Sequence, residues 1–284
     1  MIYKSPLRYP GGKSRAVRFL NEFIPAYTEF REPFFGGGSL GIYLLQKREK
    51  ALYKASDINF ELYCFWTQLQ INKLALISGV QQVYNDCQSD KNGKHLFNTL
   101  LERRQNTLSD LQRAVDFYVL NRITFSGVVD SGGYSQGSFE GRFTQSSIDR
   151  LHITSELIQP VNFYCEDYTY LVQLQGDEVF IFLDPPYHAA TKSKLYGKKG
   201  ILHTKFDHVQ LFKNLKETKH KWMVTYDNSD FIKDLYSEFY QVQWHLVYGM
   251  TTKHSRGNNN ELIIANFDLM AQREINLRKA AISI

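Results

Sequence analysis

The tetrapeptide Asp184-Pro185-Pro186-Tyr187 directly follows the continuous apolar run Val179–Leu183, which is typical of a buried central strand. Two consecutive prolines remove two backbone donors and fix φ, so the nearby carbonyls stay outside any strand ladder. The Asp184 carboxylate and the Pro185 carbonyl could each accept one N–H of an amine on a planar ring, while Tyr187 stacks on that ring. Such bonding aims the nitrogen lone pair at an electrophile. The alternative is a strand that ends in a Pro-Pro turn and has no chemical role.

A glycine run and a carboxylate follow two earlier strand candidates. The run 36–38 lies between a predicted strand at 30–35 and a predicted helix at 40–46, whose N-cap we expect to be Ser39. Glycines at such a turn let the backbone approach a ligand closely. Asp57 ends the next strand candidate and is placed to accept hydrogen bonds from ribose hydroxyls. The glycine spacing differs from G-x-G-x-x-G, which argues against a dinucleotide site.

A third candidate lies near the N-terminus, where Gly12-Lys13-Ser14 is similar to the end of a phosphate loop. That motif requires a glycine five positions before Gly12, and Leu7 stands there, which excludes nucleoside triphosphate binding on this ground. Lys13 could instead hold the carboxylate of an amino-acid ligand, with Tyr9 packed on the cofactor. The alternative is a solvated N-terminal loop.

The composition limits the class of protein. The chain has 284 residues and is 43% hydrophobic, enough for one large core, or for a core and a smaller second domain. No apolar run approaches the roughly 18 residues of a membrane span, and the N-terminus lacks the pattern of a secretory signal. The 3 cysteines are far apart and odd in number, which indicates neither a disulfide framework nor a metal site. We therefore expect a cytoplasmic protein without a metal.

The charge distribution is uneven although the net charge is only +5. Residues 151–187 hold six acids and no lysine or arginine, whereas residues 188–221 hold nine lysines and two acids. An acidic stretch beside a basic one indicates a site for a cationic ligand next to a surface for an anionic polymer. The alternative for the lysines is a solvated face.

The order of the elements predicts an α/β fold. The strand–loop–helix–strand–acid order that ends at Asp57 is a βαβ unit, and it implies a parallel sheet with its ligand at the carboxyl ends of the strands. Residues 73–150 contain polar helical segments and a loop rich in Gly and Ser from Ser126 to Gly141, which indicates an inserted helical subdomain. Further expected elements are helices at 60–71 and 209–216, strands at 161–165, 179–183 and 222–226, and an antiparallel pair at 242–248 and 261–267.

Together these segments resemble the DNA adenine-N6 methyltransferases related to the Dam methylase, the D12 class (alpha group) in which the glycine-rich motif precedes D-P-P-Y. The resemblance covers nearly the whole chain and is specific in order and spacing. The motifs are R-Y-P-G-G-K at 8–13, E-P-F-F-G-G-G-S at 32–39, S-D-I-N at 56–59, F-Y-V-L-N-R at 117–122, N-F-Y-C-E-D-Y at 162–168, D-P-P-Y at 184–187, F-D-H at 206–208 and N-E-L-I-I-A-N at 260–266.

The resemblance implies a Rossmann-like methyltransferase sheet that uses S-adenosylmethionine as the methyl donor. It implies a catalytic domain at 1–59 and 156–284 and a target-recognition subdomain at 60–155. The substrate it implies is double-stranded DNA, from which an adenine is flipped out and held by the residues matching Asp184–Tyr187. The implied cofactor contacts are Tyr9, Lys13, Phe35, Gly36, Gly38, Asp57, Asp167 and Asp184.

This sequence departs from the family pattern at the position that reads the DNA target. Dam-type enzymes that read GATC carry an arginine where this chain has Asp130, and an aspartate suits a cytosine amine or repels phosphate. We therefore expect a target other than GATC. The loop from Arg122 to Arg142 should supply base readout. For Arg122 the alternative is a structural role, in which it holds the subdomain together. Non-specific, salt-dependent binding to phosphates should come from the N-terminal arm and mainly from Lys192, Lys194, Lys198, Lys199 and Lys205.

The expected reaction is a direct in-line transfer, because a sulfonium methyl group is already activated and needs no covalent enzyme intermediate. None of Cys64, Cys87 and Cys165 lies near a motif that would form such an intermediate. The alternatives are an RNA or cytosine-N4 methyltransferase, a catalytically dead DNA-binding module and, least favoured, a nicotinamide-dependent oxidoreductase. Cytosine-N4 enzymes usually carry Ser-Pro-Pro, so the aspartate argues against that class. We further expect a prokaryotic or phage enzyme that acts as a monomer or weak dimer. Its expected protein partner is a cognate restriction endonuclease.

Overall fold

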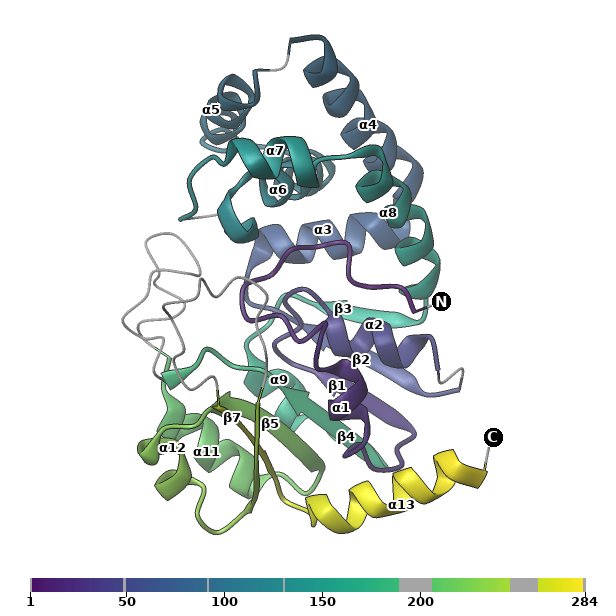
Figure 1. Cartoon of the computed structure of the whole chain (residues 1–284), viewed down its shortest axis with the longest axis vertical. Coiled ribbons are helices and arrows are strands. Elements are labelled where there is room, and N and C mark those ends of the chain that lie inside the picture. Colours follow the sequence, from purple (N-terminus) through teal and green to yellow (C-terminus); the bar gives the residue numbers. More distant parts are fainter. Residues whose placement is uncertain are drawn as a thin grey trace.

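The computed structural model describes residues 2–47, 50–90, 92–129, 131–188, 206–245 and 260–282. In this part of the chain, a sheet flanked by helices lies below a group of helices, as Figure 1 shows. The sheet has seven strands in the order β3-β2-β1-β4-β5-β7-β6, and β7 runs antiparallel to its neighbours. The strands are β1 Glu29–Glu32, β2 Leu52–Ser56, β3 Val161–Tyr164, β4 Val179–Leu183, β5 Lys221–Asp227, β6 Tyr240–His245 and β7 Asn260–Ala265.

The strand order places a topological switch point at the centre of the sheet. From β1 the chain continues outward through β2 and β3, whereas β4 pairs with the other side of β1 and leads to β5. Ligands of open α/β sheets bind at such a point, beyond the carboxyl ends of the strands. The predicted α/β class with a mostly parallel sheet is confirmed, as is the closing antiparallel pair.

Both faces of the sheet carry a hydrophobic core, which explains the continuous apolar run of β4. Its five residues are all buried; Phe180 and Phe182 belong to one cluster, and Val179, Ile181 and Leu183 belong to the other. Successive side chains of a strand point to opposite faces, so a strand covered on both sides must be apolar at every position.

Short helices surround the sheet, and one begins differently from our prediction. Helix α2 has Gly38 and not Ser39 as its N-cap, because the chain enters the helix through a left-handed residue with φ +62°. Among the described residues, no helix combines the length and apolarity that crossing a bilayer requires. Helices α1, α9, α12 and α13 were not predicted. The helices are α1 Val17–Asn21, α2 Ser39–Leu45, α9 Tyr168–Gln173, α11 His208–Glu217, α12 Asp230–Leu235 and α13 Leu269–Ile282.

The segment between β2 and β3 is helical, as expected, but part of the predicted glycine-rich loop is a helix. Helix α7 forms inside that loop because the Ser135 side chain caps it, accepting from the Ser138 amide at 3.2 Å, and because Phe139 is buried. Helix α6 is buried from Ala114 to Ile123 at the centre of this group. The elements are α3 Phe60–Ile71, α4 Lys73–Asp90, α5 Gly93–Arg103, α6 Asp110–Ile123, the short 3-10 helix η1 Phe125–Gly127, α7 Gln136–Arg142 and α8 Gln145–Leu157.

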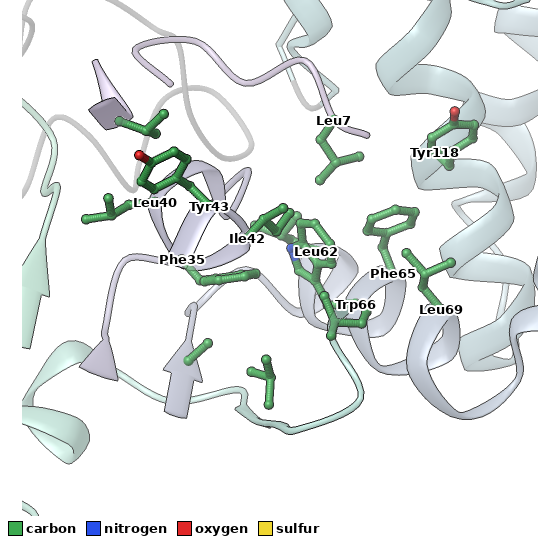
Figure 2. Packing of buried hydrophobic residues seen from close by; sticks show 14 of the residues in the cluster. Leu7, Phe35, Leu40, Ile42, Tyr43, Leu62, Phe65, Trp66, Leu69 and Tyr118 are labelled. Atoms are coloured by element: carbon green, nitrogen blue, oxygen red, sulfur yellow. The ribbon is translucent and has the colours of Figure 1, made fainter. Parts of the chain in front are cut away.

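Helix α3 joins the two parts through one continuous core. It contacts β3 on one side and α6 on the other. Trp66 packs edge-on against Phe35, and Phe65 stacks on Tyr118 with ring centroids 5.7 Å apart. Burial of such rings contributes strongly to stability, and here it also fixes the orientation of the helical group on the sheet. Figure 2 shows this core, with Leu7, Phe35, Leu40, Ile42, Tyr43, Leu62, Phe65, Trp66, Leu69 and Tyr118 labelled.

Candidate active site

A cavity of about 710 Å³ opens at the carboxyl ends of β1, β2, β3 and β4. Its volume lies in the range of about 300–1,000 Å³ that is usual for ligand pockets. All of the catalytic and cofactor residues that the sequence predicted line it, although they come from five separate segments. These residues are Tyr9, Lys13, Phe35, Gly36, Gly38, Asp57, Asp167 and the tetrapeptide Asp184–Tyr187.

The glycine loop after β1 adopts a backbone conformation that side chains would block. Gly36 has φ +48° and Gly38 has φ +62°, and a Cβ on Gly36 would lie 2.8 Å from the Tyr9 ring. The Trp66 indole donates to the Gly36 carbonyl at 3.0 Å, which ties the loop to α3. The loop therefore presents bare, rigid backbone to the cavity.

Asp57 holds the other face of this loop. Its carboxylate accepts from the Gly36 amide at 2.9 Å and from the Asn59 amide at 3.0 Å. Burial raises the pKa of Asp57, and these two hydrogen bonds partly offset that effect. A carboxylate has about four acceptor sites, so Asp57 can accept further hydrogen bonds from a ligand in the cavity. Asp167 caps α9 through the Thr169 amide and lines the cavity from the end of β3.

Asp184 stands in a network that the sequence did not predict. The Lys13 ammonium lies 2.7 and 3.0 Å from its two carboxylate oxygens, and the Thr225 hydroxyl donates to Oδ1 at 2.7 Å. Lys13 is 2% exposed and also lies 4.8 Å from the centre of the Tyr187 ring. A second carboxylate, that of Glu261, lies 4.0 Å from the same ammonium. These bonds hold the Asp184 carboxylate in one plane at the wall of the cavity.

Glu32 is a further buried carboxylate in the cavity wall. It is the last residue of β1 and accepts from the Gly41 amide at 3.0 Å. Burial raises its pKa well above the usual value, and the negative charge of Asp184 raises it further. The sequence offered a signal, since Glu32 stands directly before Pro33 and the glycine motif, but we did not assign it a role.

Comparison with known proteins decides the family to which this site belongs. The family model of the D12 class N6 adenine-specific DNA methyltransferases matches residues 9–252. The chain belongs to this family. The D12 class chain is 24% identical over 265 residues to the Type II methyltransferase M.MjaIII of Methanocaldococcus jannaschii, with 84% of this chain and 90% of that protein covered. It is 24% identical over 279 residues to the Type II methyltransferase M.CviBI of Paramecium bursaria Chlorella virus NC1A, with 93% and 100% covered.

A third relative of the D12 class chain is a DNA adenine methylase of Vibrio cholerae, which is 27% identical over 187 residues, with 64% of each chain covered. The family assignment establishes an adenine-specific DNA methyltransferase. It sets aside the RNA-directed, cytosine-N4 and nicotinamide-dependent alternatives.

One DNA-binding residue predicted for the D12 methyltransferase has another role in the structure. Arg122 is 4% exposed and donates to the carbonyls of Pro6 at 2.8 Å and Arg142 at 3.0 Å. Burial lowers the pKa of its guanidinium to about 10. Arg122 therefore has the structural role that was the alternative to DNA binding, because it holds the N-terminal segment against the helical group. The Arg142 side chain, in contrast, is exposed at the end of α7.

The remaining DNA-binding predictions cannot be placed in the D12 methyltransferase, because those residues lie outside the part of the chain that the structure describes. They are Asp130, Lys192, Lys194, Lys198, Lys199 and Lys205.

Phe125 is a candidate functional residue to which no role was assigned from the sequence. Its side chain is 64% exposed, and it begins the loop whose residues Gly127, Val128 and Val129 line the cavity. The next residue, Ser126, has φ +54°, a left-handed conformation that is uncommon for a residue with a side chain. A large exposed aromatic ring two positions before the cavity lining begins is available to stack on a planar partner. The signal was an aromatic residue three positions after the motif L-N-R.

Proposed function

We propose that this D12 class methyltransferase transfers the methyl group of S-adenosylmethionine to N6 of an adenine flipped out of double-stranded DNA. One observation carries the proposal. Asp184 and Pro185 line a cavity that the glycine loop and Asp57 also line. The proposed amine acceptors and the proposed nucleoside-binding loop thus share one cavity.

The residues of the cavity fit the cofactor. The glycine loop, whose backbone conformation excludes side chains, leaves room for a ligand to approach closely. Acidic residues at or just after the carboxyl ends of four neighbouring parallel strands, β3, β2, β1 and β4, line the cavity, which suits a positively charged ligand. When bound, S-adenosylmethionine supplies a methyl group that its sulfonium charge has already activated. The residues that would hold it are Tyr9, Lys13, Phe35, Gly36, Gly38, Asp57, Asp167 and Asp184.

The chain's own part in the reaction is to hold the amine. Asp184 and the Pro185 carbonyl accept the two N–H bonds of N6, and the Tyr187 ring stacks on the base. Lys13 and Thr225 keep the carboxylate from rotating, so the acceptor is in place before the reaction begins. After transfer, the surplus proton on N6 leaves to the Asp184 carboxylate or to water.

The position of the cavity supports base flipping and a recognition role for the helical segment 60–155. Gly127, Val128 and Val129 of this segment line the same cavity as Asp184, so both parts of the molecule contribute to it. An adenine inside a duplex cannot reach an acceptor in this cavity without leaving the stack. The exposed Phe125 and Arg142 are placed to contact DNA beside this wall.

We infer the DNA target sequence and the biological role from the amino-acid sequence and from the relatives. Asp130 in place of a guanine-reading arginine favours a target other than GATC. Two relatives are named Type II methyltransferases, and we propose that this chain likewise protects DNA against a cognate restriction endonuclease. Methylation of the sequence cut by that endonuclease should then block cleavage.

The proposal is tested with purified protein, unmethylated DNA and S-adenosylmethionine carrying a labelled methyl group. Single-molecule sequencing should locate the modification on adenine within one dominant motif other than GATC. Label on cytosine, or none on DNA, would refute the adenine reaction. Modification confined to GATC would refute only the interpretation of Asp130.

A further inference from the structure

The N-terminal segment is bound to helix α6 by a fully buried side chain. Asn121 is 0% exposed, and its carbonyl oxygen accepts from the Arg8 amide at 2.9 Å. Its amide nitrogen donates to the Arg8 carbonyl at 2.7 Å and to the Gly127 carbonyl at 2.9 Å. One side chain therefore binds both the N-terminal segment and the loop Thr124–Val129, hereafter the wall loop.

Further contacts bind Arg8 to the same region. Its guanidinium donates to the Thr124 carbonyl at 3.0 Å and to the Ser138 hydroxyl at 3.0 Å. Gly127 has φ +76°, and a Cβ on it would lie 2.2 Å from the Arg8 carbonyl oxygen. The N-terminal segment and the wall loop thus touch backbone to backbone, and neither can shift without moving the other. Figure 1 shows the N-terminal segment (purple) running beneath the helical group before it reaches α1.

The other end of this segment reaches the catalytic carboxylate. Tyr9 packs against the glycine loop, and the Gly12 amide bonds to the Tyr9 carbonyl at 3.0 Å in a tight turn. Lys13 donates to the Gly11 carbonyl at 3.0 Å and to Asp184 at 2.7 Å. The turn is closed by its own hydrogen bonds. A displacement of Arg8 is therefore passed on to Lys13 and is not absorbed within the turn.

We propose that Pro6–Lys13 is a coupling strap through which DNA bound at the wall loop sets the placement of Asp184. Asn121 is the positioning residue that joins the strap to the loop. The wall loop carries the exposed Phe125 and lines the cavity with Val128 and Val129. DNA that binds this loop would therefore shift the Thr124 and Gly127 carbonyls, which bond to Arg8 and to Asn121. This inference rests on the proposed function, since it assumes that DNA contacts the wall loop.

The test uses Asn121→Ala, because a side chain with no exposed surface has no contact with DNA or cofactor to lose. The control is Ser135→Ala, which removes the cap of α7 in the same region and leaves the strap bonds in place. Single-turnover methylation of target DNA is measured with DNA and S-adenosylmethionine saturating, together with the Kd of each. Hydrogen exchange of residues 9–16 is followed with and without target DNA.

We expect Asn121→Ala to lower the single-turnover rate at least about tenfold, because small misplacements of catalytic groups cost up to about 100-fold. Both Kd values should stay within about twofold of wild type, which is well under 1 kcal/mol of binding free energy. DNA should slow exchange in residues 9–16 of the wild type and of Ser135→Ala, but not of Asn121→Ala. Ser138→Ala, which removes only one bond to Arg8, should show a smaller effect in the same direction and replaces Asn121→Ala if that variant does not fold.

An unchanged rate, or a rate loss matched by weaker DNA binding, would overturn the coupling role. So would a wild type in which residues 9–16 do not respond to DNA. Failure of the wild type to methylate adenine would instead refute the proposed function, and the exchange measurement with DNA would still decide whether the strap responds.

Discussion

The substitution Asp184→Asn separates the catalytic role that we propose for this side chain from its ion pair with Lys13. The amide has the same shape, but its nitrogen is a donor where the carboxylate oxygen was an acceptor. That nitrogen must face either the Lys13 ammonium, which both Asp184 oxygens contact, or the adenine amine that we propose the carboxylate holds in the cavity. One consequence is catalytic and the other concerns stability.

The magnitudes follow from the contacts. Loss of one preorganised hydrogen-bonding partner in a transition state costs about 10²–10³ in kcat, and an opposing donor adds to this, so we expect a loss of at least about 10³. Breaking a buried ion pair costs about 3–5 kcal/mol. Asp184 is 21% exposed, and Glu261 remains 4.0 Å from Lys13, which reduces the cost here to about 2–3 kcal/mol.

The assay pairs single-turnover kinetics with urea unfolding for Asp184→Asn, Lys13→Met and the double variant. The double variant removes the stranded ammonium together with its partner, but it also takes the cation away from buried Glu261, so it should recover part of the stability without recovering activity. The matched control is Asp230→Asn, because the Asp230 side chain is 94% exposed and should change neither quantity. Turnover of Asp184→Asn within about tenfold of wild type would refute the catalytic role. A double variant no more stable than the single one would refute the energetic role of the pair.

Three further predictions concern the cavity and its mouth. Because burial raises the pKa of Glu32, the folded protein keeps this proton where the unfolded chain has already released it, and stability falls as pH rises above 4.5. Glu32→Gln does not titrate, so its free energy of unfolding in urea should gain on that of wild type as the pH rises above 4.5. A gain that does not depend on pH would contradict this. Gly38→Ala should weaken S-adenosylmethionine binding at least about tenfold by calorimetry, since its Cβ would lie 2.4 Å from Phe35, whereas Gly133→Ala, which meets nothing within 4 Å, should bind normally. Phe125→Ala should weaken target-DNA binding about tenfold by anisotropy at unchanged thermal stability, because the ring is 64% exposed; equal affinity would count against stacking.

Much of the fold and site could be predicted because the signals are local. The apolar run of β4 reports burial on both faces, and the prolines after it report the end of the ladder. The glycine run indicates a turn that excludes side chains, and Asp57 follows a strand. Parallel strands bring their carboxyl ends to one edge, so these local signals combine into one site without further information.

Other features escaped prediction because they depend on partners distant in sequence. Helix α7 lies in a segment rich in glycine and serine, and its cap and the burial of Phe139 outweigh that composition. Arg122 reads equally well as a DNA contact or a structural residue, and only its burial against Pro6 distinguishes the two. An arginine carries the same charge in both settings, so its sequence neighbours cannot decide between them.

The amino-acid sequence by itself predicted which chemical groups the enzyme brings to its reaction: an acceptor pair at Asp184 and Pro185, a glycine turn without side chains and a carboxylate at Asp57. Only the tertiary structure decided what holds those groups. Lys13 and Thr225 bond to Asp184 across 171 and 41 positions of sequence, and Asn121 bonds to Arg8 across 113 positions. Backbone propensity and side-chain pattern act over a few residues, whereas a hydrogen bond depends on distance in space, which the packing of α3 and α6 beside the sheet sets.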